Sequence, residues 1–214
     1  MGKLHFATLA LMAVNVLFSM KGFKDYSFFE KYKFGIRQIR QGEYVRLLSS
    51  GFLHADWQHL IFNMITLYFF ADIIILYAGF VQFVLLYLFA LVVGNLFSFY
   101  FHRNEPYYTA VGASGAVSGI LYASILFNPK MTIIVFVLPM PGYLFAIGYL
   151  LYSIYGMKSR TDNIGHSAHF GGAVSGLIYA LAYDPSLVQR EPLLLGAMLI
   201  PIVLLFVFRK KIWR

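Results

Sequence analysis

Long apolar runs separated by polar segments make up most of the chain. A helix rises about 1.5 Å per residue, so about 20 apolar residues cross the roughly 30 Å hydrocarbon core of a bilayer. Most of the runs are close to this length, and the pattern therefore predicts an all-α polytopic membrane protein with seven transmembrane helices, the last at the C-terminus. The predicted spans are residues 4–20, 57–78, 79–101, 111–127, 141–155, 166–183 and 193–208.

These spans are expected to form a single membrane domain over residues 1–214. Its core covers about residues 4–184, and residues 192–208 add the C-terminal helix. Residues 4–20 could also be a signal peptide, but no clear small-x-small cleavage site follows them, so we expect a first membrane helix. The connector 21–56 carries seven Lys/Arg and many aromatic residues, a mixture that suits the membrane interface.

Prolines mark the ends of several spans. Asn128-Pro129 ends the fourth span because proline cannot continue a helix, and Pro141 fits the first turn of the fifth. The fourth span has only about 17 residues, or roughly 25 Å of helix, which is too short to cross the hydrocarbon core. If this short helix reaches one face, its other end lies below the opposite surface. We therefore expect a polar cavity around Ser114.

Two spans begin with similar glycine-rich stretches. Gly115 and Gly119 are four residues apart in one, and Gly172 and Gly176 are four residues apart in the other. This small-xxx-small spacing lets two membrane helices bring their backbones close together. The sequence therefore predicts that the fourth and sixth spans pack tightly against each other.

Ser114 and His169 stand at the heads of these two spans, so tight packing would bring them within hydrogen-bond reach. A serine hydroxyl is a weak nucleophile until a base takes its proton, and histidine is the usual base. The pair therefore predicts acyl transfer, here hydrolysis. His59 and Asn63, at the head of the second span, are four residues apart and share one face of a helix.

Composition and charge narrow the classes of function. The chain is 60% hydrophobic and 12% charged, with a mean hydropathy of +0.70, which is typical of polytopic membrane proteins. The net charge of +8 comes from basic residues in the loops and at the C-terminus, which favours contact with anionic lipid headgroups over nucleic acid. The chain has no cysteine, which excludes disulfides, thiolate metal sites and a cysteine nucleophile.

Three motifs lie on three different spans: His59-x-x-x-Asn63, Gly112-x-Ser114-Gly115 and Ala168-His169-x-x-Gly172-x-x-x-Gly176. With these motifs in this order, the chain resembles the rhomboid intramembrane serine proteases from about residue 46 to about residue 183. A glycine-x-serine-glycine match alone is weak, but the three motifs together are specific.

The resemblance implies a Ser-His dyad without a carboxylate third member, in which Ser114 attacks the scissile carbonyl and His169 relays the proton. It assigns oxyanion donors to His59 and Asn63, joined by the backbone N–H of Ser114, and a structural role to His54. It also implies transmembrane protein substrates, and neither a metal nor a cofactor. The fifth helix and the loop after it would resemble the family's substrate gate and cap. The motif glycines expected to support the site are Gly112, Gly115 and Gly172.

Three features depart from the family pattern. The Trp-Arg pair of the first loop is Val45-Arg46 in this chain. Some members carry an aromatic residue one turn after the serine, where it stacks on the histidine, but this position is Ser118. Another group must therefore hold His169 in place. The seventh segment is additional to the six-helix core and resembles the six-plus-one arrangement found in part of the family.

The sequence leaves two other functions open. One is a non-catalytic rhomboid-like protein that binds or chaperones transmembrane helices, although such a protein has no need of Ser114, His169 and Asn63 together. The other is a small transporter or channel, although the spans carry no acid apart from Asp72 and no repeat symmetry. A metal site is also conceivable, but zinc fits poorly without a carboxylate ligand nearby. Its histidines would be His54, His59, His166 and His169.

We expect a multi-pass integral membrane protein of a bacterial inner membrane; the sequence identifies neither the substrate nor the oligomeric state. The resemblance places the N-terminus in the cytoplasm and the mouth of the site on the external side. In that orientation 14 of the 17 Lys/Arg face outward, against the positive-inside rule. We favour the family orientation because the basic connector would lie along the membrane interface.

Overall fold

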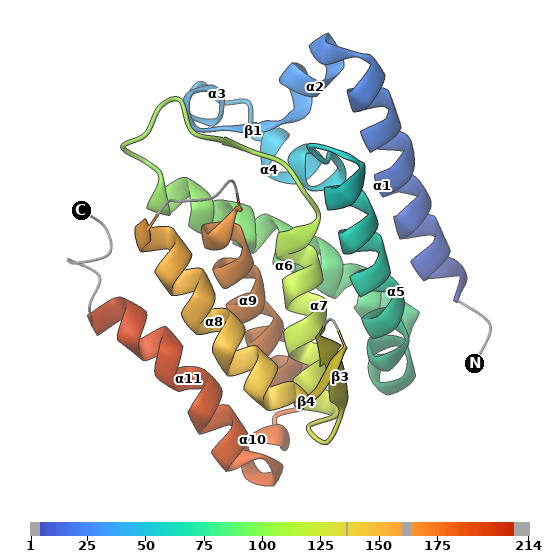
Figure 1. Cartoon of the computed structure of the whole chain (residues 1–214), viewed down its shortest axis with the longest axis vertical. Coiled ribbons are helices and arrows are strands. Elements are labelled where there is room, and N and C mark those ends of the chain that lie inside the picture. Colours follow the sequence, from blue (N-terminus) through green and yellow to red (C-terminus); the bar gives the residue numbers. More distant parts are fainter. Residues whose placement is uncertain (1–4, 136, 160–163, 208–214) are drawn as a thin grey trace.

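The computed structural model describes residues 5–135, 137–159 and 164–207, and they form a bundle of tilted helices in which α6 crosses behind α7 (Figure 1). By length and composition, three of the described helices, α1, α5 and α6, can each cross a membrane, and α7 and α11 are shorter apolar helices. The predicted helical membrane fold is thus confirmed. The long helices are α1 (Phe6–Lys24), α5 (Trp57–Ala78), α6 (Phe80–Phe101), α7 (Ser114–Phe127), α8 (Gly142–Ser159), α9 (His166–Tyr183) and α11 (Pro192–Val207).

Several helix boundaries agree with the hydrophobic pattern. The predicted spans 57–78 and 166–183 coincide with α5 and α9. Helix α1 continues to Lys24, beyond the predicted end at residue 20. It ends there because the Asp25 side chain accepts a hydrogen bond from the backbone N–H of Phe28 at 3.0 Å, which caps the start of the next helix.

The connector between α1 and α5 folds over one end of the bundle (Figure 1). Arg46 is buried there, and its Nε donates to Glu43 Oε2 at 2.7 Å while Nη1 donates to the carbonyls of Glu30 and Lys33 at 2.8 Å each. Arg46, the arginine of the Trp-Arg pair that is Val45-Arg46 in this chain, therefore holds this connector together. The connector comprises α2 (Tyr26–Tyr32), β1 (Phe34–Gly35), α3 (Ile36–Arg40), α4 (Arg46–Ser49) and the 3₁₀ helix η1 (Ser50–Phe52).

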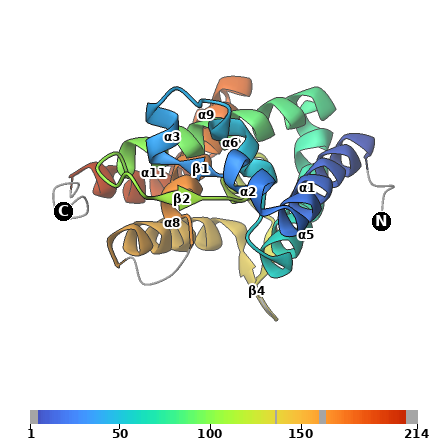
Figure 2. The same cartoon turned by 90° about the horizontal axis from the view of Figure 1, so that it is seen from above.

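A β-hairpin precedes α8, and here the prediction for Pro141 was wrong. Strands β3 (Thr132–Val135) and β4 (Leu138–Pro141) pair antiparallel, with Pro141 opposite Thr132. The β-branched residues of β3 favour a strand, and Pro141 lacks an N–H and therefore occupies a position that needs no donor. Helix α8 begins only at Gly142. Figure 2 shows β4 projecting from the side of the bundle.

Helix α7 is the centre of the bundle, since every residue after Ser114 is buried. It crosses α9 at the predicted glycines. A Cβ added at Gly172 would lie 2.0 Å from the carbonyl oxygen of Gly115, and one at Gly176 would lie 2.2 Å from that of Gly119. No side chain fits between the two backbones, so the predicted tight packing is confirmed.

The remaining helices cover the outside of this crossing. Helix α10 (Leu187–Arg190) is a short turn that leads from α9 to α11. Helix α11 lies along α8 (Figure 1), and its Met198 and Leu205 are buried in the same apolar core as α7. The additional seventh helix is therefore packed onto the bundle.

Candidate active site

Ser114 is the first residue of α7 and is partly exposed. The helix has 14 residues, or about 21 Å, whereas α5 has 22 residues, or about 33 Å. In Figure 1, α7 begins below the connector and not at the end of the bundle. The end of α7 that carries Ser114 is therefore recessed, as the short fourth span predicts.

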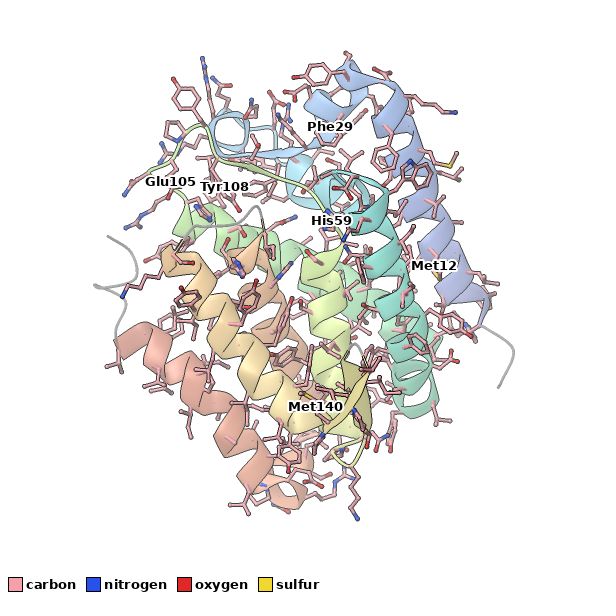
Figure 3. The ribbon with its side chains drawn as sticks, viewed as in Figure 1. Met12, Phe29, His59, Glu105, Tyr108 and Met140 are labelled. Carbon is pink, nitrogen blue, oxygen red and sulfur yellow. The ribbon has the colours of Figure 1, made fainter. Side chains whose placement is uncertain are left out.

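Gly112 brings His59 close to this hydroxyl. A Cβ at Gly112 would lie 2.7 Å from His59 Nε2 and 3.6 Å from Ser114 Oγ. Gly112 also has a φ of +129°, a conformation that side chains other than glycine's rarely adopt. Only glycine fits here, and it lets the imidazole of His59 lie against the backbone beside the serine. Figure 3 shows His59 at the upper end of α5, beside the start of α7.

Asn63 lies one turn below His59 on the same helix. It is buried, and its Nδ2 donates to the carbonyl of His59 at 2.9 Å. An amide nitrogen has a second proton to donate. The structure therefore places His59 beside the serine and Asn63 one turn further along the same helix, which packs against α7.

His54 fixes the residue that precedes the serine. Its Nε2 accepts a hydrogen bond from the backbone N–H of Ala113 at 3.3 Å, and its Nδ1 lies 2.9 Å from Ser19 Oγ. Burial, with a smaller contribution from the imidazole of His59, lowers the pKa of His54 to about 3. The ring is therefore neutral, and because Nε2 accepts, Nδ1 carries the proton and donates to Ser19. The predicted structural role of His54 agrees with this connection between α1 and the start of α7.

His169 lies in the first turn of α9, at the same end of the bundle as Ser114. A Cβ at Gly115 would lie 3.3 Å from the carbonyl oxygen of Ala168. The residue after the serine is thus in contact with the residue before the histidine. His169 is 8% exposed, so its ring faces the interior of the bundle.

Tyr149 of α8 binds this histidine. Its hydroxyl lies 2.8 Å from His169 Nδ1, and the two rings stack with centroids 5.8 Å apart and planes 20° apart. The hydroxyl of Ser118 also interacts with that of Tyr149. The aromatic ring that is missing at position 118 is therefore supplied from a different helix. Sequence reasoning missed Tyr149, because it is one of 16 tyrosines and only the packing of α8 against α9 singles it out.

The four histidines considered for a metal site lie in two pairs. The rings of His54 and His59 have centroids 5.0 Å apart, and those of His166 and His169 have centroids 6.3 Å apart. Within the described residues, no group of three His, Asp or Glu is placed to hold a metal ion. His166 instead packs against α8, where a Cβ at Gly156 would lie 2.1 Å from its Nε2.

Comparison with known proteins identifies the family of this site. The family model described as "Rhomboid domain" matches residues 41–185. "Rhomboid protein 1, mitochondrial" of Saccharomyces cerevisiae is 29% identical over 181 residues, 79% of this chain and 51% of that protein. "Rhomboid protease GluP" of Bacillus subtilis is 35% identical over 154 residues, 67% of this chain and 27% of that protein.

A human protein, "Presenilin-associated rhomboid-like protein, mitochondrial", is 33% identical over 155 residues, 69% of this chain and 40% of that protein. The chain thus spans about half or less of the length of these relatives. Their names include mitochondrial proteins, so the comparisons do not support the expectation of a bacterial inner membrane.

Proposed function

Because the chain belongs to the rhomboid family of integral membrane proteins, we propose that it is an intramembrane serine endopeptidase in which Ser114 is the nucleophile and His169 the general base. The observation that carries this proposal is the contact of Gly115 with Ala168, which brings the neighbouring serine and histidine to one recessed place in the bundle. A relative of this chain bears the name of a protease.

Tyr149 gives the dyad an orienting group. In a serine hydrolase the base must present an unprotonated nitrogen to the hydroxyl, and a third group holds its other nitrogen. We assign the Nδ1 proton of His169 to the hydrogen bond with Tyr149 Oη, so that Nε2 accepts the proton of Ser114. A neutral phenol then takes the place that a carboxylate has in other hydrolases.

The oxyanion of the tetrahedral intermediate needs donors at the same place. The first N–H groups of a helix have no partner within the helix and carry partial positive charge, and Ser114 begins α7. We assign its N–H, the ring of His59 and the amide of Asn63 to the oxyanion hole. Loss of one such donor typically slows an acyl transfer by about 100- to 1,000-fold.

The substrates proposed are transmembrane proteins. A helix protects its amide bonds by internal hydrogen bonding, so a substrate must unwind locally before a recessed serine can reach a carbonyl. Substrates with small or helix-breaking residues near the cleaved bond are therefore expected to react fastest.

Reaction with a fluorophosphonate probe tests the proposed function directly. Purified protein in detergent should be labelled at Ser114 and should cleave a transmembrane substrate, because an activated serine attacks both. Ser114→Ala should lose label and cleavage while it still captures the substrate. Folded wild-type protein that captures a transmembrane helix but neither reacts with the probe nor cleaves would instead be the non-catalytic binder.

Removal of one hydroxyl tests the role of Tyr149. Tyr149→Phe keeps the ring that stacks on His169 but removes the hydroxyl that binds Nδ1, and the loss of a hydrogen bond to a buried polar group costs about 1–3 kcal/mol. We expect kcat to fall by about 10- to 100-fold with KM almost unchanged. Tyr155→Phe, an exposed tyrosine of the same helix, is the matched control. Equal kcat values for the two variants would remove Tyr149 from the mechanism.

A further inference from the structure

A second cluster of buried polar side chains joins the end of α6 to the start of α9. His102 follows α6 directly and is buried. Its Nδ1 lies 3.2 Å from Glu105 Oε2, and its Nε2 lies 3.2 Å from Ser167 Oγ. Ser167 Oγ lies in turn 2.9 Å from Ser98 Oγ of α6. This Ser-His-Glu arrangement is separate from the dyad described above.

The cluster has the hydrogen-bond connectivity of a catalytic triad, but a substrate cannot reach its serine. Ser167 is 1% exposed, so no substrate carbonyl can approach its hydroxyl. Its neighbour Ser98 is buried to the same degree. The hydrogen bonds of this cluster therefore hold backbone segments together and do not activate a nucleophile.

The two segments that His102 joins are the ones that carry the dyad. Its ring stacks on that of Tyr108, with centroids 3.5 Å apart and planes 7° apart, and Tyr108 lies on the segment that leads to Ser114. Ser167 lies two residues before His169 in the first turn of α9. Figure 3 shows Glu105 and Tyr108 on the segment that passes over this end of the bundle.

The segment that carries Tyr108 is itself anchored to the connector. The carbonyl of Tyr108 accepts a hydrogen bond from the N–H of Ile36 at 3.2 Å. The next two residues form β2 (Thr109–Ala110), which pairs antiparallel with β1. The backbone N–H of Gly112 then donates to the carbonyl of Ser50 at 3.0 Å. These hydrogen bonds hold the backbone from Tyr108 to Gly112, just before the serine. A side chain that binds Tyr108 therefore contacts a segment whose position determines that of Ser114.

We propose that His102 is a positioning residue that sets the first turn of α9 against the segment 102–113, and thereby sets His169 against Ser114. This inference rests on the proposed function. With Glu105 accepting from Nδ1–H, Nε2 accepts the hydroxyl proton of Ser167, and Ser167 Oγ accepts that of Ser98, so each bond of the cluster has one donor. A displacement of about 1 Å between reacting groups can cost about 100-fold in rate, so a modest shift of this turn is enough to be measured.

Ser167→Ala tests the proposal with a minimal change in volume. We expect the rate of fluorophosphonate labelling at Ser114 to fall about 10-fold, and kcat to fall with it while KM for a transmembrane substrate changes little. Ser175→Ala is the matched control, because Ser175 is a buried serine of the same helix whose hydroxyl donates to a carbonyl of that helix, that of Gly172, at 2.6 Å. A loss of the same size in both variants would overturn the proposal.

Two variants of His102 test the bond itself. The amide of His102→Gln can occupy the place of Nε2 and keep the bond to Ser167, whereas that of His102→Asn can occupy only the place of Nδ1. We expect His102→Gln to retain most of the labelling rate and His102→Asn to behave as Ser167→Ala does. Equal rates in His102→Asn and wild type would overturn the proposal.

A spectroscopic measurement separates this inference from the proposed function. In protein labelled with ¹⁵N-histidine, the imidazole resonances of His169 should shift in Ser167→Ala and not in Ser175→Ala. This shift is expected even if wild-type protein does not react with the probe, in which case the proposed function fails and the positioning of His169 stands. Unchanged His169 resonances in Ser167→Ala would refute the positioning.

Discussion

His169→Ala should lower the rate of substrate cleavage by about 10,000-fold, as should Ser114→Ala, and the double variant should be no slower than either alone. Residues that act as one unit in a serine hydrolase give such non-additive losses. Without the imidazole the hydroxyl keeps its proton, and without the hydroxyl the imidazole has no proton to take. The residual rate then comes from the oxyanion donors and from binding.

The measurement is cleavage of one transmembrane substrate by protein reconstituted in vesicles, with folding verified from the unfolding temperature of each variant. His5→Ser is the matched control. His5 caps α1, where its Nδ1 accepts from the backbone N–H of Ala7 at 3.2 Å, and serine is also a good N-cap. Losses that multiply in the double variant would mean that the two side chains act independently, which contradicts a dyad.

The helices of this fold follow from the sequence because lipid leaves the backbone few alternatives. Every N–H and C=O in the hydrocarbon must be satisfied within its own segment, so an apolar run of about 20 residues becomes a helix. This explains why residues 57–78 and 166–183 could be delimited in advance. The segment that ends at Pro141 instead pairs its backbone groups in a hairpin, which its β-branched residues favour.

The sequence predicts a residue of the site only where a single residue type can fill the position. Gly112 was identified from the motif, and the structure gives the physical reason, since a Cβ there would meet the ring of His59 at 2.6 Å. Tyr149 and His102 could not be identified, because their roles depend on which helices meet. Each touches a partner that lies far away in the sequence or on another helix, at His169 and at Ser167 respectively. Periodicity within one helix carries no signal of such contacts.

Different contacts hold the two residues of the proposed dyad, Ser114 and His169, in place. The serine is fixed through the backbone, by His54 at Ala113 and by Ser50 at Gly112. The histidine is fixed through its side chain, by Tyr149. These contacts hold the two residues separately, and the glycine crossing of α7 and α9 sets one against the other. The crossing therefore affects the geometry of the site as well as the stability of the fold.

Gly172→Ala should therefore destabilise the protein by about 3 kcal/mol, the upper end of the cost of overpacking a core. The added Cβ would lie 2.0 Å from the carbonyl oxygen of Gly115 and 3.0 Å from its Cα. These are backbone atoms, which cannot rotate away as a flexible side chain can. The two helices must separate, and Ser114 and His169 must separate with them. Labelling of Ser114 by a fluorophosphonate should consequently be lost even at temperatures where the variant is still folded.

Gly196→Ala of α11 makes the same chemical change where a Cβ meets nothing within 4 Å. Alanine favours a helix over glycine by up to about 1 kcal/mol, so this control should be as stable as wild type or slightly more stable, and fully labelled. The free energy of unfolding of both variants can be measured by titration with a denaturing detergent in mixed micelles. If Gly172→Ala unfolds at the same detergent fraction as Gly196→Ala, the helices do not cross at this glycine. The crossing of α7 and α9 would then no longer support the proposed protease function.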